Sequence, residues 1–459
     1  MSLLHTIASF VVALGLLIVV HELGHYVVAR WCGVKVLRFS VGFGRALFAR
    51  RLGPDQTEWV IAAVPLGGYV KMVDEREGDV APDDLPRAFN RQSVWKRFAI
   101  VVAGPVANFL LAIALYWCLF MSGVQEAKPI VAAPEAGTVA AQAGLRAGDT
   151  IRAINDEPVA GWQDVRWRLL QLALDRKPAR FEVADGRGAI DWRTLDLSRV
   201  AADEVEGDLL AKLGMRLYRP ELPPVIGKVI AGGVAARTGL AAGDRVIAVN
   251  GERIPSWEAL VAKFRASPGR ALVLDVERGD ATRGDTTRRF ELVPEGATQG
   301  TETIGRIGAA PQVDEAALKA YYFEIRYGPV EAAAKAVART WEMSIFSLRM
   351  LGKMIVGEVS WRNLSGPVTI ADYAGQSASL GLAPYLAFLA LISISLGVLN
   401  LLPIPLLDGG HLMYYMIEVL KGSPVSERVM EIGQRAGLAV LLFLMAFAFY
   451  NDINRLLTG

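Results

Sequence analysis

Uncharged, apolar runs lie near both ends of the chain. Residues 98–121 and 380–407 contain no charged side chain, and each run is longer than the about 20 apolar residues that cross a bilayer as a helix. Shorter apolar runs begin at residue 6 and at residue 436. We therefore predict four membrane-spanning helices, at about residues 4–29, 98–121, 383–403 and 433–451.

The first of these runs is predicted to remain in the mature protein. It lacks the basic start and the small-residue cleavage site of a signal peptide. Its later part contains His21, Glu22 and His25, which would then lie inside the membrane. Ionisable side chains at that depth are costly and usually functional, so these three residues are candidates for a site.

Lysine and arginine are unevenly distributed among the loops. Residues 30–97 hold twelve of them, whereas residues 1–5 hold none, and Lys421, Arg428 and Arg435 lie near the connection between the third and fourth predicted helices. Basic residues favour the cytoplasmic side in short loops. Both of these connections are therefore expected in the cytoplasm, with the two termini and residues 122–380 on the opposite side.

The middle of the chain contains a repeat. Residues 140–149 read AAQAGLRAGD and residues 235–244 read AARTGLAAGD, an offset of 95. In each copy a β-prone run, a turn and an amphipathic helix follow, which indicates duplicated domains. The offset also holds for three pairs beyond the string, Asn155 with Asn250, Glu157 with Glu252, and Trp162 with Trp257.

The repeated string resembles the permuted bacterial form of the PDZ domain. This resemblance implies a groove between a strand and a helix, with residues 213–215 and 307–309 as the groove strands, which binds peptides such as free C-termini by strand addition. The alternative is a pair of small β domains that serve as spacers.

The expected fold is a mostly α membrane protein with four transmembrane helices and a membrane-associated β hairpin, with two α+β PDZ domains inserted between spans 2 and 3. An amphipathic helix over residues 330–356 would lie near the outer membrane surface, before a chain break at residues 363–367. The predicted parts are an N-terminal membrane part with a β region at 35–75 (1–125), a first PDZ domain (126–220), a second PDZ domain (221–312), amphipathic periplasmic helices (313–380) and a C-terminal membrane part (381–459).

The string His21-Glu-Leu-Gly-His25 predicts a metal site. On a helix, residues i and i+4 lie on one face, so both imidazoles can reach one ion. Zinc lowers the pKa of a bound water to near 7, and the adjacent Glu22 can take that proton during attack on a carbonyl. This spacing is typical of zinc metalloproteases. The alternative is a buried polar cluster that pairs with other helices.

Asp408 is the candidate for a third protein ligand. Pro403 and Pro405 interrupt the third apolar run, and irregular backbone at membrane depth is tolerated only where it is buried or lines a wet cavity. A metal ligand would explain a carboxylate there. Two alternatives stay open: Asp408 could cap a following helix, and His411 could compete for the metal, although a structural role is favoured for that histidine.

These motifs resemble those of the site-2 protease family of intramembrane zinc metalloproteases. The resemblance rests on HELGH in the first span, Gly104-Pro-Val-Ala-Asn108 in the second and Leu407-Asp408-Gly409 after the third. With the tandem repeat it extends over nearly the whole chain, and it is closest to the proteobacterial branch that regulates sigma-E. It implies that His21, His25 and Asp408 bind Zn2+ and that Glu22 is the general base.

The resemblance also implies substrates and further residues. Expected substrates are single-span proteins of the bacterial inner membrane, cut within their transmembrane segment: an anti-sigma factor of the envelope stress response that another protease has already truncated, and remnant signal peptides. Asn108 would lie near the active site and Asn400 would help to hold the substrate. Family members often have a second Asn where this chain has Ser395.

Two β-prone runs flank Pro65-Leu-Gly-Gly68 within residues 57–73. The resemblance implies a membrane-re-entrant hairpin, whose unpaired edge would be unfavourable in lipid unless a substrate supplies the missing strand. Residues 42–44 are assigned to the same sheet. The alternative is an ordinary cytoplasmic hairpin. The residues expected to contact an unwound substrate are Gly67, Gly68, Tyr69, Val70, Lys71 and Met72.

Charge and composition exclude some functions and leave others open. The chain has 49 basic and 47 acidic residues, and no basic stripe or zinc-finger spacing, so no nucleic-acid partner is expected. A membrane scaffold that gathers partners through PDZ domains would need neither Glu22 nor zinc. A metal transporter would also use intramembrane His, Glu and Asp, but it would show paired helix breaks in both halves. The protease is the favoured function.

Overall fold

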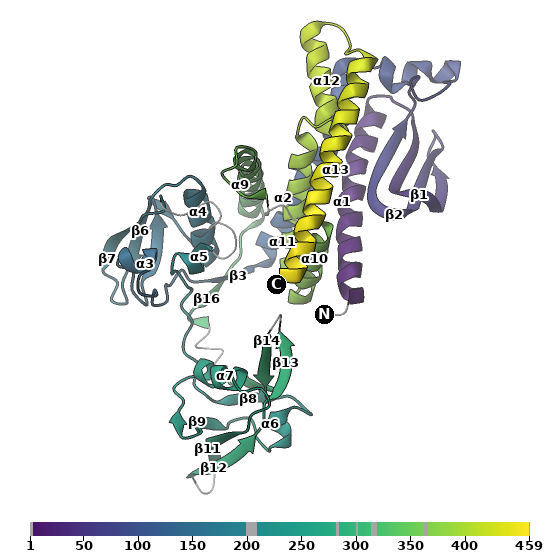
Figure 1. Cartoon of the computed structure of the whole chain (residues 1–459). Helices are drawn as coiled ribbons and strands as arrows, with labels where there is room; N and C mark the ends of the chain where they lie inside the picture. The colour runs from purple at the N-terminus through teal and green to yellow at the C-terminus, as the bar shows by residue number, and fades with distance from the viewer. Residues whose placement is uncertain are drawn as a thin grey trace. The chain divides into compact units, whose positions relative to one another are not determined.

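The computed structural model describes residues 3–198, 209–280, 284–299, 302–313, 319–361 and 366–458 (Figure 1). It divides into two compact units. The first consists of Met1–Val124 and Glu324–Thr458, and the second of Gln125–Phe323. Two short strands, β3 (Val124–Ala127) and β16 (Tyr322–Ile325), lie where the chain passes between the units. Each unit is described by itself.

Four helices of the first unit are long and apolar enough to cross a membrane, which confirms the four predicted spans. The first, second and fourth extend beyond the predicted bounds at both ends, because these helices continue past the apolar run into polar residues. The third begins one residue before its predicted start and ends two residues before its predicted end. The four are α1 (Leu3–Trp31), α2 (Val94–Ser122), α11 (Leu382–Leu401) and α13 (Glu427–Thr458).

Helix α2 packs against both α1 and α11, and small residues allow these close approaches. A Cβ on Gly24 of α1 would lie 2.8 Å from the Cβ of Ala107, and one on Gly397 of α11 would lie 3.0–3.2 Å from the ring of Phe109. A further helix, α12 (Asp408–Lys421), also packs on α2. The three elements that carry the candidate site residues therefore meet around one helix.

Strands β1 (Val36–Leu52) and β2 (Thr57–Met72) pair in antiparallel fashion, but not as the predicted hairpin. The two β-prone arms on either side of residues 65–68 do not pair with each other. Residues 38–41 of β1 lie between them, since Phe39 pairs with both Trp59 and Val70. The later part of β1 pairs with residues 57–62, so residues 68–72 form an edge that has β1 on one side only.

The remaining elements of the first unit are two short 3-10 helices, η1 (Pro82–Arg87) and η2 (Phe89–Arg91), and the helices α9 (Pro329–Ile355) and α10 (Pro367–Leu380). Helix α9 covers nearly the same residues as the predicted amphipathic helix. Most of the predicted break at 363–367 lies outside the described residues. Both oxygens of the buried Asp452 on α13 accept hydrogen bonds from the start of α10, including those from the N–H groups of Gly366 and Val368.

The second unit contains two copies of one arrangement of elements. The first copy has a four-stranded sheet in the order β5-β4-β6-β7, and the second has the order β10-β9-β11-β12. In the first copy these elements are α3 (Val139–Gln142), β4 (Thr150–Ile154), β5 (Glu157–Pro158), α4 (Trp162–Leu174), β6 (Ala179–Ala184), β7 (Ile190–Leu195) and α5 (Leu209–Lys212).

The second copy repeats this series from α3 to β7, with strand β14 where the first copy has α5, and it adds short strand pairs, β8 with β15 and β13 with β14. Each copy has its own hydrophobic core, around Phe181 and Leu169 in the first and around Leu260 and Leu274 in the second. The elements are β8 (Ile226–Val229), α6 (Val234–Arg237), β9 (Arg245–Val249), β10 (Glu252–Arg253), α7 (Trp257–Arg265), β11 (Leu272–Asp280), β12 (Gly284–Leu292), β13 (Glu295–Gln299), β14 (Glu302–Arg306) and β15 (Ala309–Pro311).

Hydrogen bonds explain why the repeated string keeps its aspartate. The buried carboxylates of Asp149 and Asp244 each accept a backbone N–H three residues earlier, from Arg146 and Ala241, at 2.8 Å. Each bond closes the turn before β4 or β9. The repeat in the sequence is thus also a repeat in local structure.

Candidate metal centre

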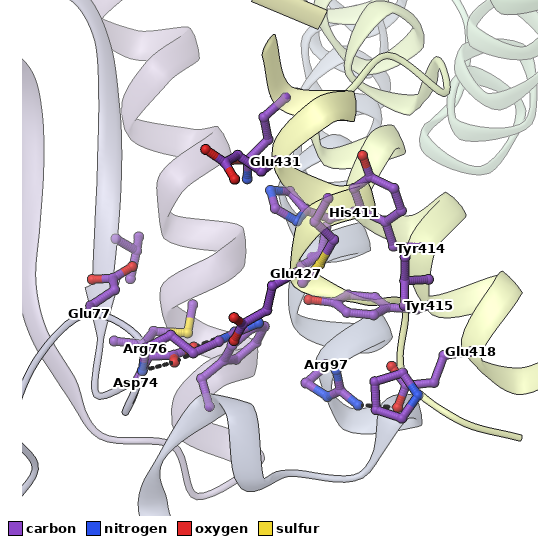
Figure 2. A pocket seen from close by; sticks show the side chains of 18 residues that line it. Asp74, Arg76, Glu77, Arg97, His411, Tyr414, Tyr415, Glu418, Glu427 and Glu431 are labelled. Atoms are coloured by element: carbon purple, nitrogen blue, oxygen red, sulfur yellow. Dashed lines mark hydrogen bonds and ion pairs between the residues drawn. The ribbon is translucent and has the colours of Figure 1, made fainter. Parts of the chain in front are cut away.

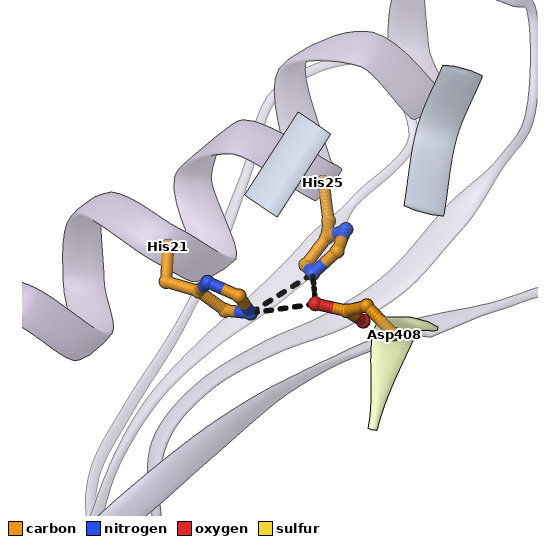
Figure 3. A group of neighbouring side chains, drawn as sticks. All are labelled: His21, His25 and Asp408. Carbon is orange, nitrogen blue, oxygen red and sulfur yellow. Dashed lines mark hydrogen bonds and ion pairs between the residues drawn. The ribbon is translucent and has the colours of Figure 1, made fainter. Parts of the chain in front are cut away.

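Three side chains from two distant segments converge on one point (Figure 3). His21 and His25 lie one turn apart on α1, and their Nε2 atoms are 3.2 Å from each other. Oδ2 of Asp408, the first residue of α12, lies 3.2 Å from Nε2 of His21 and 3.5 Å from Nε2 of His25. In the described part of the chain, no other group of three His, Cys, Asp or Glu residues is placed to share an ion.

The connection between α11 and α12 directs Asp408 toward the histidines. Leu406 has a positive φ of 88°, and Gly410 packs so tightly that a Cβ there would lie 2.6 Å from the carbonyl oxygen of Ile404. The start of α12 has Leu407 as its N-cap and no side-chain cap hydrogen bond. The alternative role of Asp408 as a helix cap is therefore wrong: its carboxylate faces the imidazoles instead.

The donor chemistry of this cluster fits a cation. Nδ1 of His25 lies 2.8 Å from the carbonyl oxygen of Ile100, which can only accept, so Nδ1 carries a proton, and in the neutral imidazole that binds metals Nε2 presents a lone pair. That lone pair faces Oδ2 of Asp408, a buried oxygen that has no hydrogen-bond partner among the described residues. Lone pairs and a negative charge at this separation repel each other unless a cation lies among them. The set of two imidazoles and one carboxylate is typical of catalytic zinc sites.

Gly104 on α2 makes room for the two imidazoles. A Cβ at this position would lie 2.6 Å from Cε1 of His25 and 2.8 Å from Cε1 of His21. Distances this short exclude any side chain without movement of the rings. The close packing of α1 on α2 thus shapes the cluster.

Glu22 is buried next to the cluster, and residue Gly68 of β2 lies against it. A Cβ on Gly68 would approach Cγ of Glu22 to 2.8 Å and Cγ2 of Ile18 to 2.9 Å. The side chain of Glu22 is 8% exposed and has no hydrogen bond or ion pair with another described residue. A buried carboxylate that is left unpaired beside three candidate ligands is available for proton transfer.

The two predicted asparagines differ in their environment. Asn108 on α2 is fully buried, and its Nδ2 lies 3.2 Å from Nδ1 of His21. Its backbone carbonyl accepts a hydrogen bond from Ser393 of α11 at 2.7 Å. Asn400 lies on α11, only partly buried, and no hydrogen bond connects it to the cluster in the described part of the chain. Ser395 bonds within its own helix, to the carbonyl of Leu391.

The six residues predicted to contact substrate all lie at or next to the open edge of β2. Gly67 has a φ of 155°, and a Cβ on it would collide with the ring of Phe43. The hydroxyl of Tyr69 accepts a hydrogen bond from Arg38 at 3.1 Å, and Nζ of the exposed Lys71 lies 3.8 Å from the carboxylate of Glu77. Val70 and Met72 pack against the small cluster around Val36 and Ile100.

A cavity of about 760 Å³ adjoins the end of β2 (Figure 2). Val70 and Met72 line it together with His411 and Tyr415 of α12. Burial raises the pKa of Tyr415 to about 12. Burial tends to raise the pKa of Asp74 at the cavity wall as well. The hydrogen bonds from Arg76 outweigh this effect and hold the pKa of that carboxyl below its ordinary value. His411 belongs to this wall and is not one of the three converging residues.

Sequence reasoning missed the carbonyl of Ile100, which faces His25, and Ser393, which bonds to the backbone of Asn108. Neither carries a motif, because a backbone acceptor and a helix-facing hydroxyl can lie anywhere in an apolar helix. Asn108 was expected near the site without a stated contact. The one available signal was its spacing, since Gly104 and Asn108 lie one helical turn apart on α2, as the histidines do on α1.

Comparison with known proteins identifies the family. Residues 9–444 match the model of the protein family described as Peptidase family M50. The chain belongs to this family. It is 43% identical over 458 residues to the protease RseP of Yersinia pestis, and 43% identical over 460 residues to the regulator of sigma-E protease RseP of Escherichia coli K12, each time with 99% of this chain and 100% of the relative covered. A protein of Ralstonia nicotianae that is named as a zinc metalloprotease is 46% identical over 466 residues, 98% of each chain.

Membership in this peptidase family confirms the predicted relationship and the prediction of a metalloendopeptidase. It decides against the scaffold and transporter alternatives. The relatives named as zinc metalloproteases support Zn2+ as the predicted cofactor. The four apolar helices and the matches to RseP proteins fit a multi-pass protein of the inner membrane.

Replacement of Gly104 by Ala should weaken metal binding. The added Cβ would displace the rings of His25 and His21, so we expect zinc affinity in detergent to fall at least about tenfold, as measured by competition with a chelator. Gly15→Ala on α1 is the matched control, because a Cβ there meets no atom within 4 Å. Equal zinc affinity of the Gly104→Ala variant and the wild type would contradict the geometry of this centre.

Proposed function

We propose that this chain is an intramembrane zinc metalloprotease that cleaves single-span membrane proteins within their transmembrane segment. The observation that carries the proposal is that Asp408 converges with His21 and His25 beside the unpaired Glu22. The two histidines and Glu22 lie on a helix apolar enough to cross a membrane. A hydrolytic site at that depth acts on bonds that soluble proteases cannot reach.

His21 and His25, through Nε2, and Asp408, through Oδ2, would hold the metal. Zinc in this position would supply a Lewis acid for the scissile carbonyl and an acidified water as nucleophile. Glu22 would accept the proton on its carboxylate as the peptide carbonyl is attacked, and it would return this proton to the departing amine. Burial of Glu22 keeps bulk water from competing for that proton.

The edge formed by residues 68–72 would bind the substrate as an added strand. A transmembrane helix keeps its carbonyls in hydrogen bonds between residues i and i−4, so it must be unwound before attack. The open edge of β2 offers replacement hydrogen bonds for an extended segment. Because Gly68 lies against Glu22, a strand paired there would have its carbonyls close to the base. Val70 and Met72 also line the cavity of Figure 2, which would receive the continuing chain.

Asn400 stays a proposed substrate contact, on a weaker basis than the β2 edge. It is partly exposed and has no partner among the described residues, so its amide is free to bind substrate backbone.

The two copies in the second unit would be PDZ domains on the periplasmic side of the membrane. Both termini of the chain would lie on that side as well. In the first repeat the extended segment follows the predicted residues 213–215, of which Leu213 and Gly214 form a turn. Arg216 and Tyr218 form backbone hydrogen bonds with residues 130–132, which leaves the backbone of Leu217 directed to the other, open edge. A cavity of about 750 Å³ lies along this edge and is lined by Trp162 and Arg166 of α4. This is the groove that a PDZ domain would use for a peptide C-terminus.

We favour a role of the two repeats as a size filter that excludes substrates with bulky periplasmic domains. The alternative is recognition of a newly exposed substrate C-terminus in the groove. Relatives of this chain are named regulators of sigma-E protease. By that relationship, the substrates would be an anti-sigma factor already truncated by another protease, and remnant signal peptides, in the inner membrane of a bacterium.

Substitution of Glu22 by Gln tests the reaction. Gln keeps the shape of the side chain but cannot accept the proton, so cleavage of a detergent-solubilised single-span substrate with a short periplasmic tail should slow by about 10²–10⁴-fold. Mass spectrometry of the products should place the wild-type cut within the transmembrane segment, and zinc content should be unchanged. Equal cleavage by both proteins would remove Glu22 from the reaction.

Proline substitution tests the open edge. Lys71→Pro on the edge of β2 should slow cleavage of a helical substrate about tenfold, because proline removes an N–H and blocks strand pairing. Arg50→Pro is the matched control, since it removes one charge and one N–H at the opposite edge, where β1 pairs with Trp59. A substrate with helix-breaking residues near its scissile bond should be affected less. Similar losses for both variants would count against a role of this edge.

Variants of the first repeat separate the filter from recognition. With Arg166→Glu or Leu217→Pro in the groove, the filter predicts unchanged cleavage of a truncated substrate, whereas recognition predicts that cleavage is abolished. With residues 126–312 removed, the filter further predicts that an untruncated substrate is cut. Gel-based cleavage assays in reconstituted membranes would measure both. Loss of cleavage in the groove variants would overturn the filter.

A further inference from the structure

The two imidazoles of the candidate metal centre are held in different ways. Nδ1 of His25 faces the carbonyl oxygen of Ile100, a group that can only accept a hydrogen bond. That contact alone leaves the proton on Nδ1 and the lone pair on Nε2, where a metal would bind. The backbone of α2 therefore sets the tautomer of His25.

His21 has an amide in the corresponding place. Its Nδ1 lies 3.2 Å from the side-chain nitrogen of Asn108. The side chain of Asn108 is fully buried, and its Oδ1 has no hydrogen-bond partner among the described residues. An amide can present either its oxygen or its NH2 group to a neighbour, so the tautomer of His21 depends on which way this amide points.

Only one orientation is compatible with metal binding at Nε2 of His21. With the NH2 group toward Nδ1, the proton of His21 must lie on Nε2, the atom that faces Asp408. With the amide turned by 180°, Oδ1 accepts a hydrogen bond from the Nδ1–H group and Nε2 presents its lone pair. The two orientations have nearly the same shape, so the turn requires no repacking.

The position of Asn108 is fixed by helix contacts that do not involve the metal. Ser393 of α11 donates a hydrogen bond to the backbone carbonyl of Asn108, and Gly104 lies one turn earlier under the imidazoles. Antiparallel packing of α1 and α2 then places Ile100 beside His25 and Asn108 beside His21. One helix thus places a carbonyl beside one ring and an amide beside the other.

We propose that Asn108 is a positioning residue for metal binding rather than a substrate contact. Its Oδ1 accepts the Nδ1–H of His21 and so holds Nε2 free for the ion. This inference rests on the metal centre of the proposed function. Partners of this kind typically change metal affinity by about 10–100-fold when they are removed.

The test compares the zinc affinities of Asn108→Leu and Asn108→Asp with that of the wild type, by titration of Zn2+ into metal-free, detergent-solubilised protein against a chelator. Leu has a similar volume but no acceptor, so its affinity should fall about 10–100-fold. Asp keeps an oxygen at the same place, so its affinity should equal or exceed that of the wild type. Asn400→Leu is the control and should bind zinc normally. Thermal unfolding of each metal-free variant shows whether the protein is folded.

The outcomes separate this inference from the proposed function. Normal zinc binding by the folded Asn108→Leu variant would overturn the role of Asn108 while leaving the metal centre intact. Weak zinc binding by both Asn108→Leu and Asn108→Asp would show that an acceptor oxygen at position 108 does not determine zinc affinity. That result would also overturn the role of Asn108. A wild type that binds no zinc would remove the metal centre, and with it both proposals. Weak zinc binding by the Asn108→Leu variant, together with normal or tighter zinc binding by the Asn108→Asp variant, supports the inference.

Discussion

The rest of the site depends on the close approach of electron-pair donors that would repel one another without a cation. Nε2 of His25 and Oδ2 of Asp408 face each other, and Nε2 of His21 lies 3.2 Å from both. Such an arrangement is stable only if the surrounding helices hold it or an ion neutralises it. Helix α2 meets the first of these conditions, since Gly104 admits the rings and the carbonyl of Ile100 orients His25. Metal affinity is therefore a property of the α1–α2 interface as much as of the three ligands.

Sequence reasoning succeeded where a short-range rule connects residue type to position. The spacing of His21 and His25 is a helical turn, and the apolar runs are long enough to span a bilayer, so both follow from periodicity. Asp408 follows from a different argument. A carboxylate next to an apolar run that two prolines interrupt is costly to bury, and a bound metal ion would offset that cost. In each case the evidence lay within one continuous stretch of sequence.

The failures concern partners that lie far apart in the chain. Alternation within residues 57–73 predicts strands, but it contains nothing about which strand lies beside them, and residues 38–41 occupy that place. The same holds for the acceptors of the imidazoles. A carbonyl at position 100 is chemically like every other carbonyl of α2, and only the packing of α1 singles it out.

The corrected sheet arrangement changes the neighbour of residues 68–72 but leaves their other edge open. In a hairpin whose two arms paired with each other, residues 57–62 would lie beside them, whereas residues 38–41 of β1 take that place in the structure. Gly68 brings this strand against Glu22 without an intervening side chain. An extended peptide would gain hydrogen bonds only where its carbonyls can also be attacked. A substrate that remained helical could neither pair with this edge nor present its carbonyls for attack. Unwinding would therefore select which peptide bond is cut as well as expose it.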